Sequence, residues 1–260
     1  MIDALVTGVS AAGGLVIGDE MEVLVERMGE RRPLDRPWWR CPTCDAPATG
    51  LAVVPLAGVL WRRCAACADP FPHRLRPVVL AVVSAAVLGA MAARLGADVV
   101  LAPYAVFGLS MVAISAVDLE RYIIPNRIVY PTLALLIPLF VISSAVDHRW
   151  GSLGRAAIAA AAAFSGFFVL HLAVPKGMGF GDVRLAGVIG LATGWLGLGH
   201  AFVGFFAGFV LGAVIGIAFV VATGGGRKTR IPFGPFLAAG AVFSIVWGSP
   251  IAHSLFHRVT

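Results

Sequence analysis

Residues 185–226 read LAGVIGLATGWLGLGHAFVGFFAGFVLGAVIGIAFVVATGGG, which is 42 residues without a charged side chain. As a single helix this stretch would be about 63 Å long, twice the roughly 30 Å hydrocarbon core of a bilayer. It is therefore predicted to cross a membrane, turn and cross back. We expect the turn near residues 197–200, where glycines cluster and His200 interrupts the apolar run.

Six further apolar segments each predict one crossing. Four of them (77–93, 99–117, 128–146 and 156–174) contain no Asp, Glu, Lys or Arg, and two weaker ones lie at about 4–25 and 233–252. The chain is thus predicted to be an all-α polytopic membrane protein with about eight transmembrane helices. The alternative for the first segment is a cleaved signal peptide, which the lack of basic residues before it disfavours.

Composition and charge agree with this class. The chain is 59% hydrophobic and 13% charged, with a mean hydropathy of +0.89, which excludes an ordinary soluble domain. If the spans alternate, all but four of the 20 Lys and Arg residues lie on one side; the exceptions are Arg94, Arg149, Arg155 and Arg258. Because basic residues are retained in the cytoplasm, both termini are predicted to face outside. No basic stretch interleaved with aromatics predicts a nucleic-acid partner.

A cytoplasmic segment of about 50 residues between the first two spans is too short to stabilise a core of its own. It contains the only cysteines of the chain, Cys41 and Cys44 in one C-x2-C pair and, after 19 intervening residues, Cys64 and Cys67 in a second pair. This spacing predicts a structural four-thiolate zinc site with no open position for catalysis. Disulfides or reduced thiols are the alternatives, and the cytoplasmic placement argues against disulfides.

Two aspartates stand at the ends of apolar spans, where an ionisable group is costly. Asp118 closes the segment 99–117, and Asp182 precedes the segment that begins at Leu185. The predicted topology places both carboxylates at the cytoplasmic face. Gly179 and Gly181 lack a Cβ atom and would let the backbone beside Asp182 approach a neighbouring helix or a substrate.

Two carboxylates brought close together share a proton, so that one activates water while the other protonates a peptide carbonyl. This chemistry predicts an aspartyl peptidase. Simpler interpretations stay open at this point: Asp118 as the ion-pair partner of Arg121 or Arg127, and Asp182 as a helix cap. His171, inside the segment 156–174, is left out of the site, because a histidine satisfied by a neighbouring helix is the commoner case.

Three motifs in order resemble the type IV prepilin peptidases, which are membrane aspartyl proteases with a G-x-G-D motif. They are Asp118 followed six residues later by Ile124-Pro125, then GFGDVRL at 179–185, then IPFGPF at 231–236. With the four cysteines, the resemblance covers nearly the whole chain. It implies Asp118 and Asp182 as the catalytic pair, with Gly179, Gly181 and Pro125 shaping the site.

The resemblance further implies an enzyme of the bacterial cytoplasmic membrane that removes the leader peptide of type IV prepilin-like precursors at the cytoplasmic face. The chain is predicted to consist of a first transmembrane helix (1–25), a zinc-ribbon-like tetracysteine segment (26–77) and a transmembrane protease core (78–260). The sequence specifies no oligomeric state. The alternatives are a proton- or cation-coupled transporter using the paired aspartates and a catalytically idle scaffold of a pilus or secretion machine.

Some relatives of this kind also methylate the new N-terminus with S-adenosylmethionine. Two elements depart from the pattern of such bifunctional members: residues 18–23 read GDEMEV and residues 76–79 read RPVV. A third departure is Asn126, where many relatives carry Asp after Ile-Pro. The proteolytic motifs therefore predict cleavage more firmly than the rest of the chain predicts methyl transfer.

Overall fold

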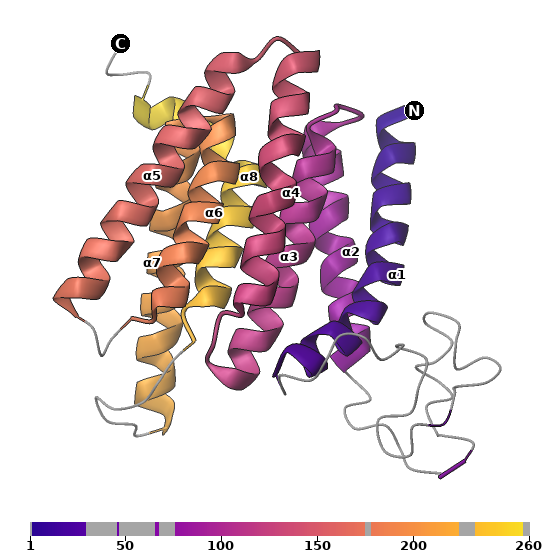
Figure 1. Ribbon diagram of the computed structural model, residues 1–260, viewed down its shortest axis with the longest axis vertical. Helices are drawn as coiled ribbons and strands as arrows, with labels where there is room; N and C mark the ends of the chain where they lie inside the picture. The colour runs from indigo at the N-terminus through magenta and orange to yellow at the C-terminus, as the bar shows by residue number, and fades with distance from the viewer. Residues whose placement is uncertain are drawn as a thin grey trace. The chain divides into compact units, whose positions relative to one another are not determined.

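The computed structural model describes residues 2–29, 46, 66–67, 76–174, 178–223 and 232–256. These residues form eight helices and no strand (Figure 1), which confirms the predicted all-α class. The helices are α1 (Ile2–Gly29), α2 (Arg76–Leu95), α3 (Leu101–Arg121), α4 (Asn126–Val146), α5 (Trp150–Ala173), α6 (Phe180–Leu196), α7 (Leu198–Thr223) and α8 (Gly234–Phe256).

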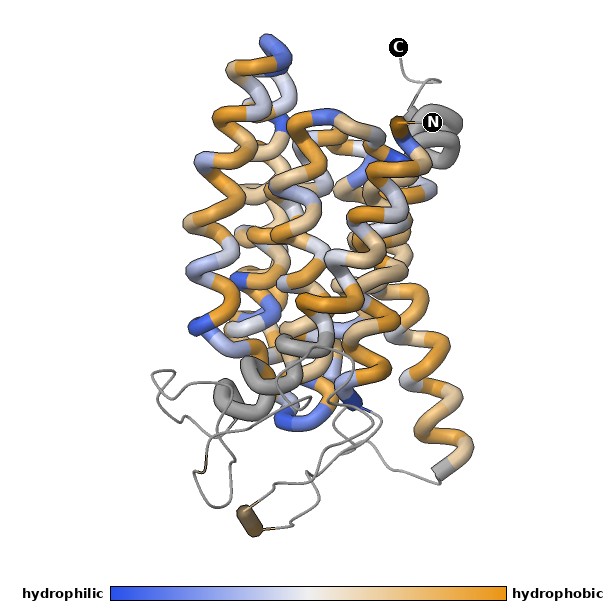
Figure 2. Tube along the Cα trace, turned by 90° about the vertical axis from the view of Figure 1, so that its right-hand side faces the viewer, coloured by the Kyte–Doolittle hydropathy of each residue, from blue (hydrophilic) through white to orange (hydrophobic). Residues whose placement is uncertain are grey.

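Five helices of the described residues are long and apolar enough to cross a membrane: α2, α3, α4, α5 and residues Leu198–Ala222 of α7. Shorter apolar stretches, Ile2–Gly18 and Gly234–Gly248, belong to α1 and α8. Hydrophobic residues run along the helices while hydrophilic residues gather at their ends (Figure 2). The chain is therefore a polytopic membrane protein, as predicted.

The predicted turn inside residues 185–226 is confirmed. α6 ends at Leu196 and α7 begins at Leu198, so Gly197 alone joins them. Gly197 has φ 155° and ψ 154°, a conformation that is essentially restricted to glycine. The missing Cβ atom is what allows a reversal of the chain in so short a link.

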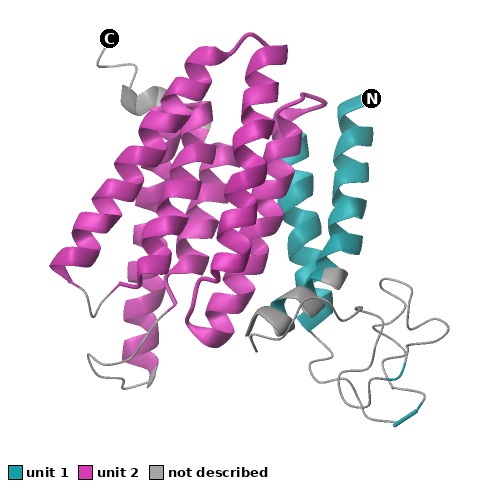
Figure 3. Ribbon diagram, in the orientation of Figure 1, with its two compact units in different colours: residues 1–93 teal, residues 94–260 magenta. Residues whose placement is uncertain are grey.

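The chain divides into two compact units, Met1–Ala93 and Arg94–Thr260 (Figure 3). In the first unit α1 packs closely on α2 through two glycines. A Cβ atom built on Gly14 or Gly18 would lie 2.7 Å from the Cα atom of Ala85 or Ala81, respectively. The predicted division at residues 25 and 77 stays a prediction, because most of 26–77 lies outside the described residues.

In the second unit, most side chains of α6 are buried, and an aromatic cluster fixes the neighbouring helices around it. The Tyr104 hydroxyl donates a hydrogen bond to the Ala192 carbonyl at 2.7 Å. The Phe140 ring lies between the rings of Tyr104 and Trp195, with centroid distances of 5.5 and 5.8 Å. Trp195 Nε1 donates to Ser144 Oγ at 3.2 Å. These contacts join α3, α4 and α6 into one packed core.

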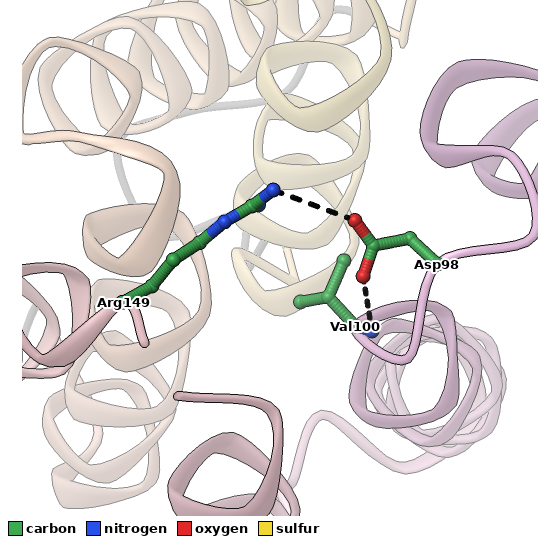
Figure 4. A network of polar contacts seen from close by, with 3 residues as sticks. All are labelled: Asp98, Val100 and Arg149. Carbon is green, nitrogen blue, oxygen red and sulfur yellow. Dashed lines mark hydrogen bonds and ion pairs between the residues drawn. The ribbon is translucent and has the colours of Figure 1, made fainter. Parts of the chain in front are cut away.

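An ion pair joins two connections at one end of this unit (Figure 4). Asp98, before α3, lies 3.7 Å from Arg149 Nη2, which belongs to the link between α4 and α5. The second oxygen of Asp98 accepts the Val100 N–H at 3.0 Å, and the Arg149 guanidinium lies 5.7 Å from the Trp195 ring. Asp98 therefore ties the start of α3 to the end of α4.

The opposite end of the second unit receives the other set of connections. Because consecutive helices run in opposite directions, the end of α3, the start of α4, the end of α5 and the start of α6 come together there (Figure 1). This end carries the residues that the sequence singled out for chemistry.

Candidate active site

Asp118 lies in the last turn of α3 and is only 4% exposed. Its Oδ2 atom accepts a hydrogen bond from the Gly234 N–H, at 2.9 Å. Gly234 is the first residue of α8, so its N–H has no partner within its own helix and is free to bind an anion. The carboxylate of Asp118 is thus held by the N-terminus of a helix that lies 116 residues away in the chain.

Gly234 is a site residue that the sequence analysis did not identify. A Cβ atom at this position would lie 2.7 Å from Asp118 Oδ2, closer than any real contact of that kind. Only glycine therefore allows the backbone to approach the carboxylate in this way. The signal that could have identified it is its place in the motif IPFGPF, between the Pro-Phe pairs at 232–233 and 235–236.

Asp182 is the third residue of α6 and is partly exposed. Its Oδ2 atom accepts the Gly179 N–H at 3.1 Å, and its own N–H donates to the Gly179 carbonyl at 3.1 Å. The Asp182 side chain therefore does cap α6, as one of the simpler interpretations held. The cap also fixes the direction in which this carboxylate points.

The structure brings Asp118 and Asp182 to the same end of the second unit. Asp118 lies in the last turn of α3 and Asp182 in the first turn of α6, so both carboxylates stand where these two helix ends come together. Since α3 and α6 both pack against α4 and α8, those two helices set the separation of the carboxylates. This arrangement supplies the pair of acidic groups that acid–base chemistry on a peptide needs.

The predicted site-shaping residues lie around Asp182 and the link between α3 and α4. A Cβ atom on Gly181 would lie 2.9 Å from the Ile124 Cβ, so glycine lets this link approach α6. Pro125 precedes α4 and its carbonyl accepts the N–H groups of Ile128 and Val129. Gly179 is the N-cap residue of α6.

Arg184 connects the first turn of α6 to the start of α4. Its guanidinium donates a hydrogen bond to Asn126 Oδ1 and lies 4.5 Å from the Phe180 ring centroid and 5.7 Å from that of Tyr130. Asn126 is the residue noted above as a departure from many relatives. Its contact with Arg184 joins α4, the helix that follows Asp118, to α6, the helix that carries Asp182.

His171, which the sequence did not place in the site, also lies beside it. Its Nδ1 atom is 2.8 Å from the Met178 carbonyl oxygen, and its ring lies 5.7 Å from the Phe180 ring. Its place at the end of α5, shortly before the glycine-rich motif, is the one sequence signal that could have included it.

The structure does not test the proposed zinc ligands. Cys41, Cys44 and Cys64 lie outside the described residues, and Cys67 is exposed. Among the described residues there is no group of three or more His, Cys, Asp or Glu side chains that could hold a metal ion.

The fold and site define a polytopic, all-helical membrane protein with two aspartates at the same end of its helices. Comparison with known proteins identifies the family to which the chain belongs. The type IV leader peptidase family matches residues 105–217, a range that includes Asp118 and Asp182.

Relatives of this chain carry the name prepilin leader peptidase/N-methyltransferase. The protein of Aeromonas hydrophila is 30% identical over 222 residues (81% of this chain and 72% of the relative), and that of Bacillus subtilis (strain 168) is 28% identical over 242 residues (92% and 93%). The protein of Stutzerimonas stutzeri is 29% identical over 240 residues (90% and 80%). The chain belongs to the type IV leader peptidase family. No solved structure matches it.

Proposed function

We propose that this chain is a membrane aspartyl endopeptidase that cleaves the leader peptide from type IV prepilin-like precursors, with Asp118 and Asp182 as its catalytic pair. The observation that carries the proposal is the placement of these two aspartates at one end of the second unit, in the last turn of α3 and the first turn of α6, within the range that matches the leader peptidase family. The relatives named above are peptidases, so the transporter alternative has no support from them.

In the proposed reaction the two carboxylates hold one proton between them. The ionised carboxylate takes a proton from water as the water oxygen attacks the scissile carbonyl carbon, and the protonated one gives its proton to the carbonyl oxygen. Proton transfer to the amide nitrogen then breaks the C–N bond and leaves an acid and an amine. The Gly234 N–H and the Gly179 N–H orient the two carboxylates for these transfers.

The position of the pair suits a substrate that is itself anchored in lipid. Both carboxylates stand at the ends of apolar helices, where a membrane-embedded substrate helix would present the segment that precedes it. We propose that this end faces the cytoplasm, that the enzyme resides in the bacterial cytoplasmic membrane, and that both termini and the links before α3 and α5 face outside. The asymmetric distribution of basic residues supports this orientation.

The decisive experiment compares purified full-length protein with its Asp118→Asn and Asp182→Asn variants on a prepilin-like peptide in detergent. Each variant should lower kcat by at least about 10³-fold, because loss of one member of a catalytic unit removes most of its rate enhancement. Asp98→Asn is the matched control: it changes an aspartate at the opposite end of the unit and should leave cleavage unchanged. Cleavage that survives either catalytic-pair substitution would refute the assignment.

We also propose N-methylation of the newly formed N-terminus as a second activity, since the relatives are named for both functions. S-adenosylmethionine would supply the methyl group: the amine nitrogen bonds to the methyl carbon, the carbon–sulfur bond breaks and the amine loses a proton. No residue of the chain is assigned to its binding. Transfer of label from methyl-labelled S-adenosylmethionine to the cleaved peptide tests this activity, and its absence would restrict the enzyme to cleavage.

The four cysteines are proposed to bind one structural zinc ion. Two C-x2-C pairs provide four thiolates, a donor set that suits tetrahedral zinc and would stabilise a segment with little core of its own. The replacement of Cys41 and Cys64 by Ser should remove zinc from the purified protein. An unchanged zinc content would contradict the proposal.

A further inference from the structure

His171 contacts the segment that carries the G-x-G-D motif through a single defined hydrogen bond. It lies in the last turn of α5, and its Nδ1 atom is 2.8 Å from the carbonyl oxygen of Met178. A carbonyl oxygen can only accept, so Nδ1 carries the hydrogen and donates it. The geometry therefore fixes which ring nitrogen bears the proton in the neutral imidazole.

His171 and Asp182 bind opposite sides of the same peptide unit. The Met178 carbonyl and the Gly179 N–H belong to the same planar peptide unit, and the Gly179 N–H donates to Asp182 Oδ2 at 3.1 Å. The imidazole, the peptide and the carboxylate thus form a continuous chain of two hydrogen bonds. Donation to the carbonyl polarises the peptide and strengthens the donation from its N–H.

Aromatic rings fix the position of the imidazole. The His171 ring lies 5.7 Å from the Phe180 ring, and the Phe180 ring in turn lies 6.2 Å from that of Phe168 on the preceding turn of α5. The end of α5 and the start of α6 are therefore held together at the place where the carboxylate must point in one direction.

We propose that His171 is a positioning residue for peptide cleavage, which orients the Asp182 carboxylate by holding the 178–179 peptide. This inference rests on the proposed function of Asp182. A rigid peptide keeps Oδ2 in one place while the substrate carbonyl and water approach the pair. Without the imidazole, the peptide could rotate about its flanking bonds, and the carboxylate would follow it.

The test uses three substitutions that differ in where they place a donor. The side-chain amide of His171→Asn places an N–H near the position of Nδ1, that of His171→Gln places it farther out, near the position of Nε2, and His171→Ala has no donor. The Ala and Gln variants should lower kcat by about 10- to 100-fold with KM within about 2-fold of wild type, because the loss lies in orientation of the reacting groups. His171→Asn should restore kcat to within about 3-fold of wild type.

His148→Asn is the matched control. His148 is exposed at the other end of α4 and has φ 55°, a conformation that Asn tolerates well, so cleavage should be unchanged. A second readout needs no substrate: hydrogen–deuterium exchange of the Gly179 amide should be faster in His171→Ala and Gln than in wild type and Asn, because the peptide is no longer held.

The two hypotheses fail in different ways. A wild-type protein that does not cleave any prepilin-like peptide would refute the proposed function. Cleavage by wild type together with a wild-type kcat in His171→Ala would overturn the positioning role alone. That role would also be overturned if His171→Asn is as slow as His171→Ala, or if the exchange of the Gly179 amide is equal in all variants.

Discussion

At the scale of single residues, the two carboxylates are held by backbone N–H groups rather than by side chains. Gly234 binds Asp118, and Gly179 binds Asp182. A backbone donor at a helix start is fixed by the whole helix and loses little freedom when it binds, so it positions a carboxylate more rigidly than a long side chain would. Glycine at one of these two places, Gly234, is required because a Cβ atom would occupy the space of the carboxylate.

Gly234→Ala is predicted to impair cleavage without removing any catalytic group. The added Cβ would lie 2.7 Å from Asp118 Oδ2, so the carboxylate or the start of α8 must shift, and kcat should fall by about 100-fold. Gly166→Ala is the control, because nothing lies within 4 Å of a Cβ atom there. The control should cleave normally and gain up to about 1 kcal/mol of helix stability. Wild-type kcat in Gly234→Ala would show that this contact does not set the position of Asp118.

The sequence could predict the aspartates but not the groups that hold them. A carboxylate at the end of an apolar run can be recognised in the sequence, because the free-energy cost of an ionisable group beside a membrane span follows from the neighbouring residues alone. The partner of Asp118 is 116 residues away, and nothing local to either residue indicates the pairing. His171 could not be assigned from the sequence for the same reason: its significance comes from the peptide of Met178 and Gly179, which lies between the imidazole and Asp182.

At the scale of elements, uncharged runs located the helices and missed some of their ends. α5 begins at Trp150 rather than at residue 156, because Arg155 is accommodated within its first turns, where its guanidinium donates to Ser152 Oγ at 2.8 Å. α6 begins at Phe180 rather than at residue 185, and so includes Asp182 and Arg184. Charged residues mark where an apolar membrane-spanning run ends, but capping contacts determine where the helix begins. Such contacts can be seen only in the three-dimensional structure.

The contact between Arg184 and Asn126 is predicted to hold the start of α6 against the start of α4. In a double-mutant cycle on unfolding in detergent, Arg184→Ala and Asn126→Ala should show a coupling energy of about 1 kcal/mol. Arg184→Lys should recover only part of the stability, since an ammonium group cannot stack on the Phe180 ring as a planar guanidinium does.

The cycle carries its own control. In the Arg184→Ala background, Asn126→Ala should have almost no effect, because its partner is already gone. Full additivity of the two substitutions would show that the hydrogen bond contributes nothing to the packing of α6 on α4, and that the stacking of Arg184 on Phe180 acts alone.

At the scale of the whole molecule, the alternating directions of the helices determine where the two carboxylates lie. Every second connection of the second unit lies at the same end, and the two carboxylates lie there because one closes α3 and the other opens α6. The distribution of basic residues predicts that this end faces the cytoplasm, where a precursor still carries its leader. Orientation relative to a membrane is a property of insertion, so the helices alone do not specify it.

Reporter fusions test the orientation directly. Alkaline phosphatase, which needs disulfides formed outside the cytoplasm, should be active when fused after Gly96 or His148, in the links before α3 and α5. It should be inactive when fused after Ile124, in the link between α3 and α4, whereas a fluorescent protein that folds only in the cytoplasm should be bright there. The reverse pattern would place both aspartates outside. A leader that remains in the cytoplasm could not then reach them, and the proposed cleavage would have to be abandoned even if the pair is intact.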